Sequence, residues 1–430
     1  MSRSSILIGV VVVLAAASSW FYIDHILVPH QVADAAAHDR PRGNFSDLYP
    51  RWLGARELLL HGRNPYSREI TKEIQRGYYG RELDASRPED PKDQAGFAYP
   101  VYVVFLLAPW VGLPFGEVRI FFFWMLMAVT AASFILWLRL LSWKLSCVST
   151  ALCALLLVCS LPAIQGLKLQ QLTLLVAGLL AACAACLNGG WLIAGGALLA
   201  LATIKPQLVW PLAIWLLCWA GREWRSRGKF VLGFGVGMVL LFAGAEIVLP
   251  GWLRMFVQAM GQYRDYTNES ILQTMLGAVF GRICEVLAIL ACIFCVRRSL
   301  NTGASSAEFG RAFALLLALT VLIVPMFALY NQVLLTPAVL MLVRDTKWSR
   351  ATSKLSSFVF GLAALLFMWP WLATLGLSIA SFFLSAEKIQ SLWQLPLHFT
   401  FAPPVFIFGL AMMQIWGGPR DGLRAGAATA

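Results

Sequence analysis

Residues 6–27 read ILIGVVVVLAAASSWFYIDHIL, an almost uninterrupted apolar run that follows Arg3 and precedes a long polar segment. A helix that crosses a bilayer takes roughly 20 mostly apolar residues, so this stretch predicts a transmembrane helix. Its position is that of a secretory signal peptide, but no small-x-small cleavage pattern follows it convincingly, and many apolar runs come later. We therefore expect a retained helix whose first residues lie in the cytoplasm.

Apolar runs of similar character recur through the rest of the chain. Of its 430 residues, 59% are hydrophobic and 13% are charged, whereas soluble domains average about 25% charged residues. The later runs cover approximately residues 117–138, 146–163, 170–187, 190–203, 207–220, 230–249, 275–296, 309–325, 328–343, 356–380 and 399–416. The sequence therefore predicts an all-α polytopic membrane protein, with residues 1–430 in one transmembrane domain.

Residues 99–113 decide the number of spans. They are apolar, but the segment is short and contains Pro100 and Pro109. If it crosses the membrane, the total is thirteen spans and the two termini lie on opposite sides. If it is a re-entrant or half-depth element, the total is twelve and both termini are cytoplasmic, which is the count we favour.

Basic turns predict which face of the membrane each connection occupies. Lys and Arg cluster at residues 222–229, 297–298, 344–354 and 420–424, and the positive-inside rule assigns such clusters to the cytoplasm. The connections on the opposite, outer face are then residues 29–97, 165–171, 205–207, 250–273 and 325–331. Two of these, 29–97 and 250–273, are long enough to carry helices of their own.

The net charge of +12 does not indicate a nucleic-acid partner. Residues 29–97 contain 11 Lys/Arg and 11 Asp/Glu, so the whole excess lies in the tails, short connections and apolar segments. That distribution is typical of anchoring to membrane lipids. All nine cysteines fall inside apolar runs, and the two C-x-x-C pairs lack His or carboxylate partners, so neither disulfides nor a zinc site is expected.

The polar connection at residues 29–97 is the first candidate for chemistry. Its residues 48–60 carry apolar side chains at helical spacing, which predicts an amphipathic helix on the membrane surface. Asp47 directly precedes that helix. In a purely structural interpretation, Asp47 or Ser46 caps the helix and has no catalytic role, and the sequence alone leaves this alternative open.

Motifs for nucleotides and metals are missing from the sequence. It contains no P-loop, no G-x-G-x-x-G after a strand and no H-E-x-x-H. Gly233, Gly235 and Gly237 lie inside an apolar run, where glycines favour close helix packing. Acidic residues 89–93 could hold a hard cation, but neighbouring prolines and basic residues favour an ordinary solvated loop. We expect that the protein requires no metal and no cofactor.

Four short motifs occur in order along the first half of the chain: Asp47 with Tyr49, then Gly62-x-Asn64-Pro65-Tyr66, then Phe97-x-Tyr99-Pro100, then Lys205-Pro206 at a helix end. This pattern resembles glycosyltransferase family 87 of the GT-C superfamily, and the resemblance implies a GT-C-like bundle of transmembrane helices. That family includes the polyprenol-phosphate-mannose-dependent mannosyltransferases of phosphatidylinositol mannoside synthesis. The likeness is clearest over residues 40–230, and Val101 departs from it where the family often has a second proline.

The resemblance implies an inverting transfer of a sugar, with mannose the best-known one, from a polyprenyl-phosphate donor to a hydroxyl of a lipid or glycan acceptor. It also implies an essential aspartate in the first outer loop, a position that Asp47 matches. A carboxylate there can take the hydroxyl proton as the glycosidic bond breaks. The active site would then face the outside of a bacterial-type plasma membrane.

The leaving phosphate needs cations as its negative charge develops, and Lys205 and Arg264 are the candidates. For Lys205 the structural alternative is a snorkelling lysine that marks a helix end. Further candidates for substrate binding are Tyr49, Arg51, Asn64, Tyr66, Tyr99, Gln171, Tyr330 and Asn331.

Two other classes of function compete with this reading. A transporter or flippase of a lipid-linked glycan would also be polytopic and basic on the inside. Transporters tend to show internal repeats and polar residues at mid-membrane in broken helices, and neither is evident here. A non-catalytic assembly subunit would keep the fold without the activity.

Overall fold

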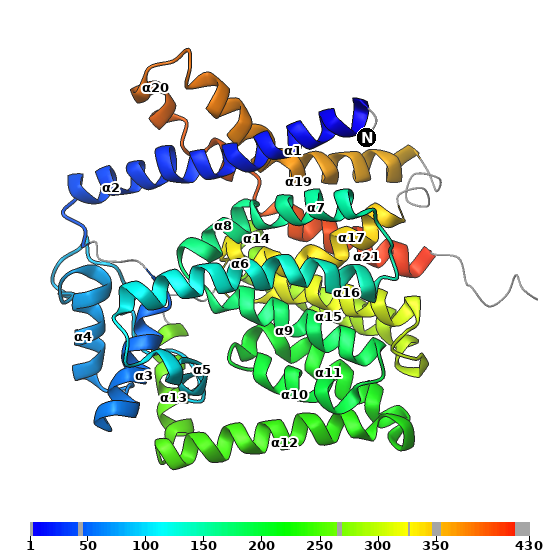
Figure 1. Cartoon of the computed structure of the whole chain (residues 1–430), viewed down its shortest axis with the longest axis horizontal. Helices are drawn as coiled ribbons and strands as arrows, with labels where there is room; N and C mark the ends of the chain where they lie inside the picture. Colours follow the sequence, from blue (N-terminus) through cyan, green and yellow to red (C-terminus); the bar gives the residue numbers. More distant parts are fainter. Residues whose placement is uncertain (1–2, 42–45, 265–268, 326, 346–353, 418–430) are drawn as a thin grey trace, which may run out of the picture.

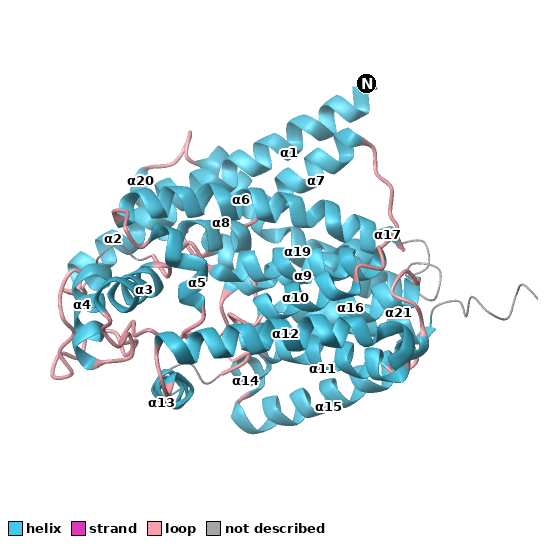
Figure 2. Cartoon of the chain, turned by 60° about the horizontal axis from the view of Figure 1, so that its bottom comes forward, coloured by secondary structure: helices cyan, strands magenta, loops and turns pink. Residues whose placement is uncertain are grey.

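The computed structural model describes residues 3–41, 46–264, 269–325, 327–345 and 354–417. These residues form helices joined by turns, with no strand among them (Figure 2). In chain order (Figure 1) the elements are α1 (Arg3–Phe21), the π-helix η1 (Tyr22–Leu27), α2 (Val28–Ala37), α3 (Tyr49–His61), α4 (Arg68–Tyr79), α5 (Val103–Leu107), η2 (Ala108–Trp110), α6 (Phe115–Leu140), α7 (Cys147–Val158), α8 (Leu161–Lys168), α9 (Leu172–Asn188), α10 (Leu192–Ala202), α11 (Pro206–Arg222), α12 (Trp224–Val248), α13 (Trp252–Arg264), α14 (Ile271–Leu276), α15 (Ala278–Val296), η3 (Ser299–Asn301), α16 (Ala307–Ile323), η4 (Leu329–Leu335), α17 (Thr336–Arg344), α19 (Lys354–Ala380), α20 (Ala386–Ser391), η5 (Leu395–Leu397) and α21 (Ala402–Gly417).

Several helices are long and apolar enough to cross a membrane. Within the described residues six meet that test by length and composition: Ile6–Ala37, Phe115–Leu140, Trp224–Val248, Ala278–Asn301, Ser357–Ala380 and Ala386–Trp416. The pair α7 and α8 would add a seventh span, bent by 59° at its break. The chain is therefore an all-helical, multi-pass membrane protein. The count of twelve spans stays a prediction, because segments such as α9 and α10 form shorter apolar helices.

The first helix runs beyond the end predicted at Leu27. It continues through Pro29 to Ala37, with one π-helical stretch, η1, before the proline. Proline has no backbone N–H, so Pro29 cannot donate the helical hydrogen bond to the carbonyl four residues earlier, which is that of His25. That carbonyl instead accepts a hydrogen bond from Gln390 Nε2 at 3.1 Å. The connection between α19 and α21 thus supplies the donor that the proline lacks, and the helix continues.

Residues 99–113 form no helix long enough to span a membrane. They fold into the five-residue α5 and the short η2, in agreement with the prediction that this segment does not cross. They pack instead on α3, where Trp52 Nε1 donates to the carbonyl of Trp110 at 3.2 Å. The helix predicted at residues 48–60 is α3, although its apolar side chains are not gathered on one face as predicted. It ends at Gly62, whose φ of +65° closes the helix in a left-handed turn.

One end of the bundle gathers the short helices. In both views α3, α4 and α13 lie together beside the ends of the long helices (Figures 1 and 2). The turn after α3 is tied to α13, because Asn64 Nδ2 contacts Met255 Sδ at 3.2 Å. At the core of the bundle, α16 is buried along most of its length. Helix α16 also packs against η4.

Helices α10 and α12 approach so closely that glycines are required between them. A Cβ atom on Gly233 would lie 2.2 Å from the backbone oxygen of Ile193, and one on Gly196 would lie 2.2 Å from that of Phe230. A Cβ on Gly235 would meet no atom within 4 Å. Gly233 therefore serves close helix packing, as predicted from its place in an apolar run, whereas the same prediction for Gly235 is wrong.

We expect Gly233→Ala to destabilise the protein, because backbone atoms on α10 cannot move aside cheaply. The free energy of unfolding should fall by about 2 kcal/mol, measured by denaturant titration in detergent micelles. Gly235→Ala is the matched control and should leave stability within about 0.5 kcal/mol of the wild type. Equal losses in both variants would exclude close packing as the cause.

Candidate active site

Asp47 is fixed against the turn between α8 and α9. Its backbone N–H donates to the carbonyl of Leu169 at 2.9 Å, and the Ser46 hydroxyl donates to Gln170 Oε1 at 2.6 Å. Gln170 itself has a φ of +48°, in the left-handed region that costs a non-glycine residue on the order of 1–3 kcal/mol. The bonds around it hold this strained turn, and as a result Asp47 lies next to Gln171.

Both oxygens of the Asp47 carboxylate accept hydrogen bonds from side chains. The Tyr78 hydroxyl, from the end of α4, donates to Oδ1 at 3.0 Å, and the Gln171 amide donates to Oδ2. Burial raises the pKa of the Tyr78 hydroxyl, so it stays a donor. The helix-capping interpretation is wrong, because Leu48 occupies the N-cap of α3 and no side chain caps that helix end.

Lys205 lies on the other side of Gln171. Its ammonium group donates to Gln171 Oε1 and to Thr173 Oγ1, the latter at 2.8 Å. The residue occupies the connection between α10 and α11 and is only 5% exposed. Burial, together with the nearby Arg51, lowers the pKa of Lys205 to about 7, although Asp47 acts to raise it. A buried lysine near its pKa at neutral pH is a functional-site candidate rather than a snorkelling helix marker.

Aromatic rings surround the two cations of the site. The Lys205 ammonium lies 5.7 Å from the ring centre of Tyr99 and 5.2 Å from that of Tyr330. The guanidinium of Arg51 stacks 4.3 Å from the Tyr99 ring and donates to the backbone carbonyl of Asp47 at 2.8 Å. Such contacts favour the charged form of a buried cation, so the rings replace part of the lost hydration.

A small polar cavity of about 50 Å³ opens among these groups. Six of the residues singled out in the sequence line it: Arg51, Tyr99, Gln171, Lys205, Tyr330 and Asn331. Tyr263, next to the predicted Arg264, also lines it, whereas the side chain of Arg264 lies outside the described part of the structure. Asp47 lies behind Gln171 and is not a lining residue, so the cavity presents cations and hydroxyls to an occupant.

Three other predicted substrate-binding residues hold the surrounding structure and do not line the cavity. Tyr49 packs edge-on against Phe115, with ring centres 4.9 Å apart. Asn64 Oδ1 accepts the N–H of Tyr66 at 2.9 Å within the turn after α3, and the Tyr66 hydroxyl donates to the carbonyl of Tyr99 at 2.6 Å. The turn thus positions Tyr99, and its role in the site is indirect.

Sequence reasoning missed two members of the hydrogen-bonded network, Tyr78 and Thr173. Thr173 Oγ1 accepts a hydrogen bond from the Lys205 ammonium, and the Thr173 hydroxyl donates to Asn331 Oδ1 at 3.3 Å. Tyr78 ends an amphipathic helix in the same connection as Asp47. The only available signal was the Tyr78-Tyr79 pair at that helix end, and periodicity does not tell which ring turns toward the aspartate.

The acidic stretch at residues 89–93 is occupied by the protein's own cations. Arg81 forms two hydrogen bonds to Asp90, at 2.5 and 2.9 Å, and Arg40 contacts Glu89 at 3.3 Å. Across the described residues no group of three or more His, Cys, Asp or Glu side chains could hold a metal ion. These carboxylates therefore stabilise the fold of the connection.

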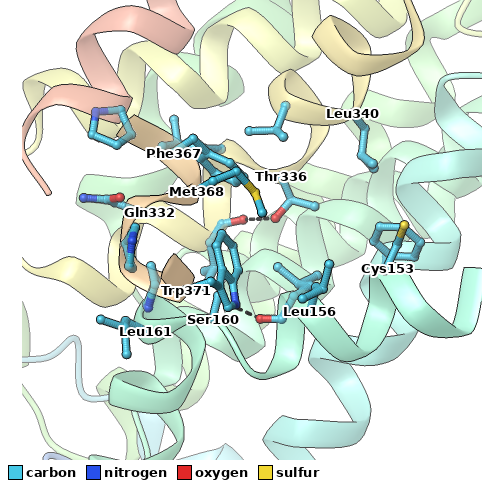
Figure 3. A pocket seen from close by; sticks show the side chains of 18 of the residues that line it. Cys153, Leu156, Ser160, Leu161, Gln332, Thr336, Leu340, Phe367, Met368 and Trp371 are labelled. Carbon is cyan, nitrogen blue, oxygen red and sulfur yellow. Dashed lines mark hydrogen bonds between the residues drawn. The ribbon is translucent and has the colours of Figure 1, made fainter. Parts of the chain in front are cut away.

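A second, larger cavity of about 250 Å³ lies on the other side of η4 and is almost wholly apolar (Figure 3). Leu156 and Leu161 border it from the broken pair α7–α8, and Phe367 and Trp371 border it from α19. Successive residues of η4 divide between the two cavities: Tyr330 and Asn331 line the polar one, whereas Leu329, Gln332 and Val333 line the apolar one. One short helix thus separates a cationic cavity from a hydrocarbon-like one.

Comparison with known families gives one match. The model of glycosyltransferase family 87 matches residues 97–325, which is more than half of the 430-residue chain. This range contains Tyr99, Gln171 and Lys205, begins after Asp47 and ends before Tyr330. No curated protein and no solved structure matches the chain.

Proposed function

The chain belongs to glycosyltransferase family 87, and on that premise we propose that it transfers a sugar, mannose in the first instance, from a polyprenyl-phosphate donor to an acceptor hydroxyl, with inversion at the anomeric carbon. Asp47 is the general base, and Lys205 binds the donor phosphate. The observation that carries the proposal is that this carboxylate and this ammonium lie on opposite ends of the same amide, Gln171.

The proposed step is a single displacement. The acceptor oxygen forms a bond to the anomeric carbon while the bond from that carbon to the phosphate oxygen breaks, and Asp47 takes the hydroxyl proton. Polyprenyl phosphate leaves with an additional negative charge. Lys205 and Arg51, both lining the polar cavity, stabilise that charge in a site of low dielectric, where fixed cations are most effective. This displacement needs neither a metal nor a cofactor.

A lipid-linked donor is supported by the pair of cavities. A polyprenyl phosphate combines a charged head with a long hydrocarbon chain, so it needs a cationic and an apolar surface within one molecule's length. The cavities on the two faces of η4 provide both. We propose that the phosphate occupies the polar cavity and that the first isoprene units pass toward the apolar one.

The proposed orientation follows from the basic turns. With residues 222–229 and 297–298 in the cytoplasm, the connections that carry Asp47 and Lys205 face the outside of a bacterial-type plasma membrane. Both termini are then cytoplasmic. The acceptor, a lipid or a glycan, reaches the half-buried Asp47 from the outer face, and no nucleic acid takes part.

The test is a transfer assay with the purified full chain in lipid nanodiscs. A short-chain polyprenyl-phosphate mannose labelled in the sugar is offered with a membrane-lipid extract as acceptor, and a nucleotide-linked mannose is offered in parallel. We expect labelled product from the lipid donor alone, with an inverted anomeric configuration. Transbilayer movement of intact donor in proteoliposomes, with no transfer, would instead support the transporter alternative.

A further inference from the structure

The Gln171 side chain contacts both the Asp47 carboxylate and the Lys205 ammonium. Its Nε2 donates to Asp47 Oδ2, and its Oε1 accepts from Lys205 Nζ. The side chain is 4% exposed. Building on the proposed function, we propose that Gln171 is a positioning residue that keeps Asp47 and Lys205 from forming a direct ion pair while it fixes the place of each.

An amide suits this task because of its two unlike ends. A carboxylate needs a donor and an ammonium group needs an acceptor, and a neutral amide presents one of each in a rigid plane. A direct ion pair between Asp47 and Lys205 would weaken both partners. The paired carboxylate would hold a proton less readily, and the paired ammonium would spend its charge on the protein rather than on a phosphate. The amide in between keeps the two charges available.

The backbone around Gln171 is held firmly enough to act as such a spacer. Its N–H donates to the carbonyl of Gly166 at 2.8 Å, and the residue occupies the N-cap position of α9, directly after the left-handed Gln170. Lys205 has a second anchor in Thr173, and Asp47 has one in Tyr78. Asp47 and Lys205 are therefore each held from two sides, and Gln171 is the support that the two share.

Each end of the Gln171 amide makes one bond to a protein group, to Asp47 and to Lys205. A second N–H and a second lone pair remain, and Gln171 lines the polar cavity, so its role in substrate binding stays a prediction. The other titratable or charged groups that act on this network come from several elements: Arg51 from α3, Tyr78 and Tyr79 from α4, Asp93 and Tyr99 from the segment between α4 and α5, Tyr263 from α13 and Tyr330 from η4. Among these, Arg51 is the only other cation, so a new carboxylate at position 171 would act directly on Asp47 and Lys205.

Two substitutions test the proposal, with wild-type transfer as the reference. Gln171→Glu places a second carboxylate beside Asp47 and gives Lys205 a charged partner. The acid limb of kcat/KM should therefore move to higher pH by about 1 unit or more, and the KM for the lipid donor should rise about 10-fold. Gln171→Met keeps the shape but removes both bonds, so kcat should fall about 10- to 100-fold.

The matched control is Gln273→Met. Gln273 Nε2 donates to the carboxylate of Glu285 at 2.8 and 3.0 Å, so this variant removes a glutamine–carboxylate bond away from the site. It should match Gln171→Met in thermal unfolding and the wild type in kinetics. An unchanged pH profile in Gln171→Glu, or a loss in Gln171→Met confined to the acceptor KM, would overturn the positioning role. Absence of transfer by the wild type would instead overturn the proposed function.

Discussion

Replacement of Asp47 by asparagine is expected to lower kcat about 1,000-fold, since a general base typically contributes between about 100- and 10,000-fold. Asparagine has nearly the same shape, and its carbonyl oxygen can still accept from Gln171 while its amide faces the Tyr78 hydroxyl, which can accept as well as donate. The network therefore survives while the basic group is lost. The measurement is initial-rate transfer from polyprenyl-phosphate mannose at saturating donor.

The control for this variant is Asp39→Asn in the same long connection. The Asp39 carboxylate is 94% exposed and pairs with Arg87 at 3.5 Å, so its loss should leave kcat and KM at wild-type values. The donor KM of Asp47→Asn should also stay within about 3-fold of the wild type, because a base that acts mainly in the transition state lowers kcat rather than donor binding. Full activity of folded Asp47→Asn would remove the proposed base.

Helix positions were largely predictable from hydropathy, and the exceptions have local causes. The run at residues 117–138 corresponds to α6, Phe115–Leu140. The run at 146–163 breaks, because Ser160 caps a new helix by accepting the N–H of Ala163 at 3.3 Å and Pro162 follows in its first turn. Both signals are visible in the sequence, but an apolar count does not weigh them. The continuation of the first helix past Pro29 was not visible, since its hydrogen-bond donor, Gln390, lies far away in the chain.

The site, like the fold, has a part that could be predicted from the sequence and a part that could not. Asp47 and Lys205 could be named from short motifs, because each is a polar group at a helix end in an apolar chain. The hydrogen bonds that link them through Gln171 could not be predicted from sequence. Asp47 and Gln171 are 124 positions apart, and Gln171 and Lys205 are 34 positions apart. Such contacts depend on how α10 packs against α9 and α11, which no periodicity encodes. The division of η4 between a polar and an apolar cavity is also a tertiary property, because Tyr330 and Gln332 are both ordinary interfacial residues in sequence.

Replacement of Lys205 by methionine should lower kcat/KM for the lipid donor about 100- to 1,000-fold, the usual effect of removing one group that stabilises developing charge. Most of the loss is expected in transfer from the phosphate donor, because the ammonium group lines the polar cavity. Lys168→Met is the matched control. Lys168 also ends a helix on the predicted outer face, but it pairs with Asp24 at 2.5 Å, so its removal should leave donor kinetics unchanged.

The proposed role of Lys205 also predicts the direction in which donor kcat/KM changes with pH. With the pKa of Lys205 lowered to about 7 by burial, the free enzyme loses the positive charge as pH rises through that value. The kcat/KM for the donor should therefore fall above about pH 7, since kcat/KM reports the free enzyme. In the enzyme–donor complex the phosphate favours the ammonium form of Lys205 and raises its pKa. The fall in kcat should therefore occur at a higher pH than the fall in kcat/KM. Lys205→Arg keeps its charge throughout, and its kcat/KM should not fall in this range.

Stability separates a functional lysine from a structural one. A lysine whose pKa is lowered in the folded state makes the unfolded chain bind more protons between about pH 7 and its ordinary pKa of 10.5. The stability of the wild type should therefore rise with pH across that window and lose this contribution as pH falls through about 7.

Lys205→Met removes a buried charge, so it should unfold at the same or a higher temperature than the wild type at pH 6, while being nearly inactive. A variant that is both inactive and strongly destabilised at pH 6 would identify Lys205 as a structural residue. Loss of activity at undiminished stability is the outcome expected if the burial of this charge is retained for the reaction.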